Sequence, residues 1–430
     1  MSRADFLLTP EELLHRRRKR LRLVVVLVLL VVFAVGAYFG TRPALNAIKG
    51  WQARRHATKA FAFIEEQKWN EARDAAVAGY QLRPSEPQAV RAVARFLSRT
   101  KQQQALEFWD RLEKTERLTR DDRRDEAAVA LAMGEGTRAA EAIAHLLDPA
   151  MGEPGPADWL LAAQAAVQGG QAEEAVPYLE KILAAPSANK REQLQAALLR
   201  LALPAPEGDP AQAARTAALA RVVELSRSDS AVGLDALLIL AQHAASLTTA
   251  REQAPADAGQ PNDSAAEATA ESSPAPAALP GTDAIPSLPD LATAIERHPL
   301  AQPPHQLLAL DLKAHQQVGG REASIEQAIA RWEDAEAPAV AALATWLNGK
   351  GEHERLLAVV PLERALQTHD LFLQYVDALG ALGRWSEIKA LLDTERFALD
   401  PVIQRMYLAR INAQLGEKTA SENNWQRALE

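Results

Sequence analysis

Apolar residues recur along most of the chain with the period of an α-helix. From about residue 50 onward, alanine-rich stretches place apolar residues three and four positions apart, which gives each stretch one apolar face. Short breaks containing Gly, Pro or Asp separate these stretches, and no convincing strand pattern occurs. The pattern predicts an all-α chain of helices joined by tight turns. The predicted turns lie near Lys68, Gln102, Gly136, Gly170, Pro204–Asp209, Gly319–Gly320, Gly349–Gly351, Gly383 and Gly416.

These turns recur at intervals of about 34 residues, which is the length of one helix–turn–helix unit. The clearest unit covers residues 156–189, where Trp159 lies on the first helix, Gly170 makes the turn, and Ala175 and Leu179 share one face of the second helix. Small residues allow the paired helices to approach closely, and large ones fill the space to the next pair. We therefore expect the tryptophans of the chain to pack in the core of the repeats.

Two short segments show the same pattern at distant positions. Residues 67–72 read Gln-Lys-Trp-Asn-Glu-Ala and residues 383–388 read Gly-Arg-Trp-Ser-Glu-Ile, so a turn is followed by a tryptophan and, three positions later, by a small or apolar residue. Together with the period, this makes the chain similar to the tetratricopeptide repeat (TPR) family over nearly all of 53–430, excluding residues 249–289. The resemblance implies a TPR-like helical-hairpin solenoid of about ten pairs with an extended concave groove.

In the TPR family the first helix of each pair lines the concave groove, which binds a segment of a partner protein. By this resemblance, Arg54, Arg91, Arg95 and Gln164 are expected to point into the groove. Their arginines would suit an acidic or C-terminal peptide. The alternative is that all four are solvated residues on exposed helix faces.

The segment Leu23–Gly40 predicts a single transmembrane helix. It contains 18 residues without a charge, 13 of them Leu, Val or Phe, which is long enough to cross a bilayer. Seven Lys or Arg precede it and five lie in residues 41–60, so the positive-inside rule places residues 1–22 in the cytoplasm and the repeats on the other side of a bacterial-type inner membrane. The alternatives are a cleaved signal peptide, with Val35–Ala37 as the cleavage site, and a buried core helix.

Residues 249–289 interrupt the helical pattern with seven prolines and no aromatic residue. Such a composition predicts a disordered, acidic linker, because it buries too little apolar surface to offset the entropy of ordering. It lies between solenoid segments at 41–248 and 290–430. Two alternatives remain open: the segment replaces the turn of one repeat, or it separates two solenoids.

Composition and charge narrow the candidate chemistry. The absence of cysteine excludes disulfides, Cys-ligated metal and thiol nucleophiles. The net charge of −8 argues against nucleic acid as a partner. The nine histidines form no metal-binding motif, and no Gly-rich segment completes a phosphate loop. We therefore expect no catalytic residue, metal, cofactor or small-molecule substrate.

These features predict a membrane-tethered scaffold that binds other proteins and is not an enzyme. A narrower alternative is a docking subunit of an envelope assembly, such as a polysaccharide export or secretion machine. An accessory domain of an enzyme is the least expected function.

Overall fold

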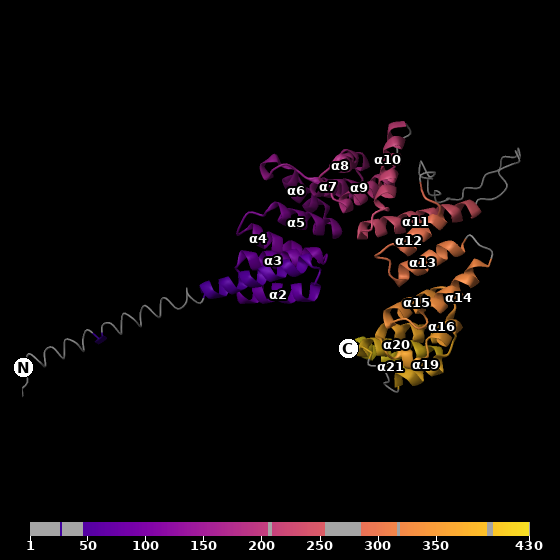
Figure 1. Cartoon of the computed structure of the whole chain (residues 1–430). Helices are drawn as coiled ribbons and strands as arrows, with labels where there is room; N and C mark the ends of the chain where they lie inside the picture. The colour runs from indigo at the N-terminus through magenta and orange to yellow at the C-terminus, as the bar shows by residue number, and fades with distance from the viewer. Residues whose placement is uncertain are drawn as a thin grey trace, which may run out of the picture. The chain divides into compact units, whose positions relative to one another are not determined.

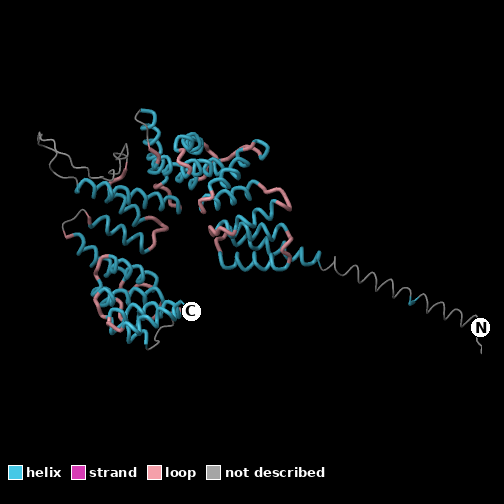
Figure 2. Tube along the Cα trace, turned by 180° about the vertical axis from the view of Figure 1, so that it is seen from behind, coloured by secondary structure: helices cyan, strands magenta, loops and turns pink. Residues whose placement is uncertain are grey.

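The computed structural model of the chain describes residues 26–27, 46–204, 209–253, 285–315, 319–393 and 399–429. All regular structure in these ranges is helical, and no strand occurs there (Figure 2). The chain divides into two compact units, residues 1–188 and residues 189–430. The expectation of an all-α protein is thus confirmed for the described part of the chain.

In the first unit the helices follow one another in layers from the N-terminal side to α8 (Figure 1). Residues 46–65 are helical and precede α2. The remaining elements are α2 (Trp69–Leu82), α3 (Pro87–Arg99), α4 (Ala105–Glu113), α5 (Arg120–Ala132), α6 (Gly136–Leu147), the 3-10 helix η2 (Pro149–Met151), α7 (Pro156–Gln168) and α8 (Ala172–Ala184).

The second unit continues the same alternation of helices and short connections. Its elements are α9 (Lys190–Ala202), α10 (Asp209–Leu225), α11 (Ala231–Gln253), α12 (Leu288–Arg297), α13 (Pro303–Ala314), α14 (Gly320–Trp332), α15 (Ala337–Gly349), α16 (His353–Val359), α17 (Leu362–Ala365), α18 (His369–Ala381), α19 (Trp385–Asp393), α20 (Pro401–Gln414) and α21 (Lys418–Leu429).

Neighbouring helices pack as hairpins in both units. In the first unit α3 packs on α4, α5 on α6, and α7 on α8. Alternate helices also touch, because α3 packs on α5 and α5 on α7. In the second unit α13 packs on α15 and α15 on α18 in the same way. Each unit is therefore a stack of helix pairs, and we call the earlier member of each pair its first helix.

Seven turns inside the pairs share one backbone geometry. In each of the seven, a residue in the left-handed conformation follows the first helix, and the next amide donates to the carbonyl five residues back. Glycine supplies this conformation at most of the turns because it has no Cβ. The left-handed residues are Gln67, Lys101, Gly134, Gly170, Gly351, Gly383 and Gly416, and the donors are the residues that directly follow them. The turns predicted at these places are thus confirmed.

Many helices begin at sites that their local sequence specifies. Proline is in the first turn of α3, α7 and α20, where its missing N–H costs nothing. At α5 and α9 a capping box closes the helix start: the Thr119 side chain accepts from the Asp122 amide, and the Asn189 side chain from the Glu192 amide.

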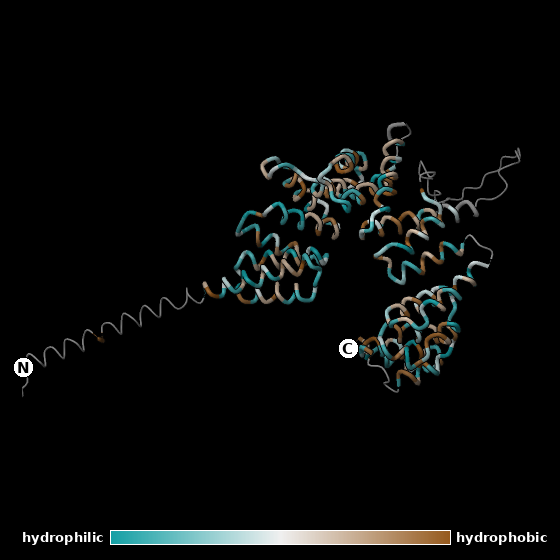
Figure 3. Tube along the Cα trace, viewed as in Figure 1, coloured by the Kyte–Doolittle hydropathy of each residue, from teal (hydrophilic) through white to brown (hydrophobic). Residues whose placement is uncertain are grey.

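Small and large residues share the core, although the tryptophans do not all lie in it. Each helix carries both apolar and polar residues (Figure 3), and many of the fully buried residues are alanines, which let the helices lie close together. Trp109 and Trp332 are buried as expected. The expectation is wrong for Trp51, Trp69 and Trp425, which are exposed. Trp69 is the first residue of α2 and Trp425 lies on α21.

Helical structure extends into both ends of the segment expected to be a linker. The helix α11 continues through Gln253 and α12 begins at Leu288, whereas the linker was expected to cover residues 249–289. Residues 254–284 of that expected linker lie outside the described residues. The two flanking helices pack against each other within the second unit. This is the arrangement that the first alternative requires, in which the segment interrupts one helix pair.

The expected transmembrane segment lies outside the described residues, except for Val26 and Leu27, which are helical. The same is true of residues 1–22. Within the described part of the chain, no helix has the length and apolar character needed to cross a bilayer.

Candidate functional site

The four residues expected in a peptide groove all lie on first helices. Arg54 is on the helix at residues 46–65, Arg91 and Arg95 are on α3, and Gln164 is half-buried on α7. The surroundings of the three arginines therefore decide what this face of the first unit can bind.

Arg54 pairs with a buried acid of the next repeat. Its Nη1 atom donates to both carboxylate oxygens of Glu86 at 3.2 Å. Glu86 is the N-cap residue of α3 and is itself buried. The pair links the first helices of two successive repeats, while the Arg54 side chain keeps about half of its surface exposed.

Arg91 and Arg95 converge on one carboxylate of α5. Arg91 Nε donates to both oxygens of Asp122 at 3.1 and 2.9 Å, and Arg95 Nη2 donates to Asp122 Oδ1 at 3.2 Å. A second acid, Glu116, lies 2.7 Å from Arg91 Nη2. Asp122 is fully buried and Arg91 nearly so.

Asp125 extends this cluster by one helical turn. Its oxygens lie 2.9 Å from Arg95 Nε and 2.9 Å from Arg99 Nε. Burial raises the pKa of Asp125, and the neighbouring Arg99 and Arg95 charges oppose that rise. Three arginines of α3 thus face three acids, so the cluster is close to electrically neutral.

The same relationship recurs between α5 and α7. Arg124 forms a two-pronged pair with Asp158, with Nε–Oδ1 and Nη2–Oδ2 distances of 2.6 and 3.1 Å. The hydrogen bond to Asp158 raises the pKa of Arg124. Asp158 is fully buried and also accepts the Gly155 amide at the start of α7 at 2.8 Å. One carboxylate therefore caps its own helix and holds the preceding first helix.

Together these contacts form an ion-pair ladder along the first helices of the first unit. We define it as the pairs Arg54–Glu86, Arg91–Asp122 and Arg124–Asp158, with Arg95 joining the second pair. The partners are 31 to 34 residues apart in sequence, which is one repeat.

The ladder changes the role expected for Arg91 and Arg95. Both were expected to offer positive charge to an acidic peptide, yet their guanidinium groups already bind Asp122 and neighbouring acids. A ligand at these positions would have to displace buried carboxylates. Asp122 closes the start of its own helix through the Thr119 amide and also binds Arg91 of the preceding first helix. The one-repeat separation between Arg and Asp is the sequence signal that would have found this pairing.

Polar contacts also link first helices of the second unit. Asp311 on α13 accepts the Trp346 Nε1 proton of α15 at 2.9 Å and lies 2.7 Å from Lys350 Nζ. Asn348 Nδ2 of α15 then donates to the side-chain and backbone oxygens of Gln374 on α18, both at 2.9 Å. Both units thus hold successive first helices together through polar side chains.

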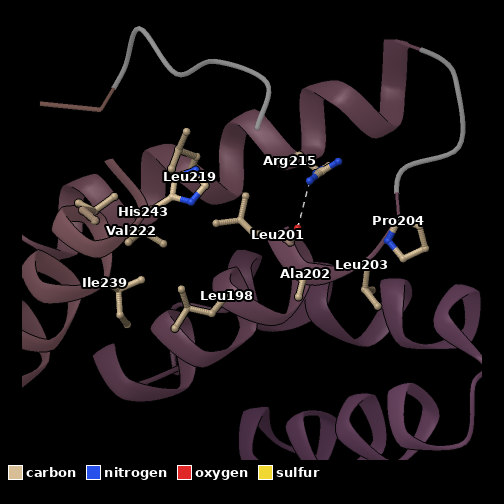
Figure 4. Close-up of a pocket in the computed structure, with 11 residues that line it drawn as sticks. Leu198, Leu201, Ala202, Leu203, Pro204, Arg215, Leu219, Val222, Ile239 and His243 are labelled. Carbon is tan, nitrogen blue, oxygen red and sulfur yellow. Dashed lines mark hydrogen bonds between the residues drawn. The ribbon is translucent and has the colours of Figure 1, made fainter. Parts of the chain in front are cut away.

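An apolar pocket opens among α9, α10 and α11 of the second unit (Figure 4). Its volume is about 640 Å³. Sequence analysis did not single it out, because its lining comes from three helices with no shared motif. The lining residues are Leu198, Leu201, Ala202, Leu203, Pro204, Arg215, Leu219, Val222, Ile239, Leu240 and His243.

Two polar side chains interrupt this lining. Arg215 Nη2 donates to the Leu201 carbonyl at 3.2 Å, the contact drawn in Figure 4. Its Nε atom and His243 Nε2 are both buried without a hydrogen-bond partner among the described residues. Burial lowers the pKa of His243, so the ring is favoured in its neutral form. The pocket lining is therefore apolar except for these two side chains.

No group of three or more His, Cys, Asp or Glu side chains that could hold a metal occurs in the part of the chain that the structure describes. Comparison with models of known protein families finds no match, and comparison with curated proteins finds none either. The interpretation of function therefore depends on the architecture and the contacts described above.

Proposed function

We propose that this protein is a membrane-tethered scaffold that binds other proteins through its TPR-like helical repeats. The observation that carries the proposal is the ion-pair ladder, which joins successive first helices through Glu86, Asp122 and Asp158. Buried, hydrogen-bonded pairs restrict the sliding of one helix past the next. A rigid surface of this kind does not have to be ordered when a partner binds, which lowers the entropic cost of association.

The binding surface in this proposal consists of the exposed residues of the first helices. Arg54 is the arginine of the predicted groove that keeps about half of its side-chain surface accessible, so it is our candidate for contact with an acidic partner. Arg91 and Arg95 stabilise this surface through their ion pairs with buried Asp122. The proposal requires no catalytic residue, cofactor, metal or small-molecule substrate.

Attachment to a membrane is the second part of the proposal. It is supported by the uncharged run Leu23–Gly40 and by the larger number of cations before it than after it. The repeats would then lie at the non-cytoplasmic surface of an inner membrane. Restricting a scaffold to that surface raises the effective concentration of partners that are held there.

The test is isolation of the full chain from its own membranes in a mild detergent. We expect the chain to stay in the membrane pellet after an alkaline carbonate wash and to co-purify with a protein partner after solubilisation. Arg54→Gln should reduce the captured partner. Because the change also removes a charge that pairs with buried Glu86, the thermal unfolding of the variant is measured beside its capture, to show that the repeats remain folded. The matched control is Lys181→Gln, which removes an exposed cation from the second helix α8.

Release of the chain by carbonate would contradict the membrane tether, and purification without any protein partner would contradict the scaffold. Equal capture by Arg54→Gln, by the control and by the original chain would remove Arg54 from the binding surface.

A further inference from the structure

The first described helix exposes an apolar and cationic stripe. Ile48 and Trp51 keep 52% and 56% of their surface exposed. Arg55, one turn further along, lies over the Trp51 ring with its Cζ atom 5.7 Å from the ring centroid. Lys59 is exposed another turn on. Residues spaced by three or four share one side of a helix, so these four form a single stripe.

The opposite side of this helix is packed in the core of the first unit. Ala53, Ala57, Ala60 and Ile64 are buried, and three of them pack into core clusters with α2 and α3. The two sides of the helix therefore differ. The packed side carries mostly alanines, whereas the exposed side combines aromatic, aliphatic and cationic side chains. Neither Arg55 nor Lys59 is paired with a carboxylate among the described residues.

The position of the stripe in the chain limits what can cover it. Ile48 is eight residues after Gly40, the end of the uncharged run, and eight residues span at most about 29 Å even when fully extended. If the run crosses the bilayer, as in the proposed function on which this inference rests, the stripe lies within reach of the lipid headgroups.

We propose that the stripe formed by Ile48, Trp51, Arg55 and Lys59 binds the anionic headgroup layer of the membrane. Tryptophan prefers this layer because its ring is apolar and its N–H needs a polar partner. Arginine and lysine keep their charge at the phosphates while their stems lie along apolar surface. The net positive charge of the stripe selects acidic lipids. Binding there would set the direction in which the repeats leave the membrane.

The absence of cysteine from the chain allows a direct test. Two full-length variants, Trp51→Cys and Trp69→Cys, are each labelled with an environment-sensitive NBD fluorophore. Both replace an exposed tryptophan, but Trp69 lies beyond the far end of the helix, about 20 Å further along its axis at 1.5 Å per residue. The labelled chains are reconstituted into phosphatidylcholine vesicles and into mixed phosphatidylcholine–phosphatidylglycerol vesicles.

We expect emission at position 51 to shift to shorter wavelength in the vesicles that contain phosphatidylglycerol, and emission at position 69 to stay unshifted. The double change Arg55→Gln/Lys59→Gln should reduce the shift at position 51. Circular dichroism checks that each variant keeps its helical content, and a label at Gln52→Cys repeats the measurement at a neighbouring exposed site.

The possible failures are distinguishable. A chain that does not float with either kind of vesicle contradicts the membrane tether itself. A chain that floats but gives the same emission at positions 51 and 69 overturns the headgroup contact and leaves the tether intact. A shift at position 51 that is equal in the two kinds of vesicle overturns the selection of acidic lipids.

Discussion

Arg91 on α3 and Asp122 on α5 form a buried ion pair between residues that are 31 positions apart in sequence, in which the Arg91 Nε–H donates to both carboxylate oxygens. The same carboxylate accepts the Thr119 amide at 3.0 Å at the start of α5. One side chain therefore connects local helix initiation to the packing of successive repeats. Because Asp122 holds two arginines in a buried site, its removal should affect stability far more than the removal of an exposed acid.

Asp122→Ala should lower the free energy of unfolding by about 3–5 kcal/mol, because it removes the buried carboxylate that Arg91 and Arg95 share and leaves the cluster with an uncompensated positive charge. The matched control is Asp121→Ala, which removes the adjacent acid. Asp121 is mostly exposed and pairs with Arg124 at 3.0 Å, so its loss should cost about 0–1 kcal/mol. Urea unfolding of the detergent-solubilised chain compares the two. Equal losses would show that the Arg91–Asp122 pair contributes no more than a surface contact.

Lys101→Gly should stabilise the protein by about 0.5–1 kcal/mol. Lys101 has φ of 54°, and a residue with a side chain pays about 1–2 kcal/mol in this left-handed conformation, which exceeds the entropic cost of glycine. Lys114→Gly is the control, since Lys114 has φ of −67° and gains no relief from glycine. Thermal unfolding followed by circular dichroism measures both variants. A lower melting temperature for Lys101→Gly would contradict the prediction.

The reverse substitution tests the same principle in the second unit. Gly351→Ala should destabilise the protein by about 1 kcal/mol, because Gly351 has φ of 78° while open space surrounds the added Cβ. Any loss at this site therefore reports on backbone conformation and not on a steric clash. An unchanged unfolding midpoint would contradict the left-handed turn at this position.

Glu296 should make stability depend on pH in the acidic range. Its pKa is lowered mainly by the hydrogen bond from Lys313, at 2.5 Å, and further by Arg331, at 3.1 Å. A carboxyl whose folded pKa lies below its unfolded value stabilises the protein above that unfolded value and loses the contribution as the pH falls through the folded pKa. Glu296→Gln should lower the free energy of unfolding by about 0.5–1 kcal/mol near neutral pH. It should not change that free energy at a pH below both the folded and the unfolded pKa of Glu296.

The measurement is a series of urea unfolding curves from neutral to strongly acidic pH. Glu180→Gln, which changes an exposed acid on α8, serves as the control. If the difference between Glu296→Gln and the original chain stays constant across the series, the ion pairs with Lys313 and Arg331 do not form in solution.

Replacement of residues 254–284 by a Gly/Ser linker should change thermal stability little. The flanking helices α11 and α12 pack against each other, and the entropic cost of a loop varies only slowly with its length, by about 0.6 kcal/mol for each doubling. Differential scanning calorimetry of the two full chains provides the comparison. A large fall in the melting temperature would show that this segment contributes to the packed structure.

Local structure was largely predictable from the sequence. The turns at Gly170, Gly383 and Gly416 were expected and occur where glycine permits a positive φ. The pairing of Arg91 with Asp122 was not expected, since it depends on the position at which α5 packs along α3. The surroundings of tryptophan were predicted only in part: Trp109 is buried as expected and donates to Ser98 Oγ at 2.9 Å, whereas Trp51 was expected in the core and is exposed.

The sequence by itself determined the all-helical class of the described residues and the places where helices turn, because these depend on interactions within about five neighbouring residues. The period of about 34 residues followed from the regular recurrence of those turns. Only the tertiary structure decided that Arg91 links α3 to α5 through a buried ion pair, that Arg54 keeps an accessible side, and that His243 borders a pocket. The physical reason is that charge and burial depend on which residues of separate repeats meet. A side chain such as Arg91 changes from a possible ligand contact to a structural one once a carboxylate 31 residues away lies within 3 Å of it.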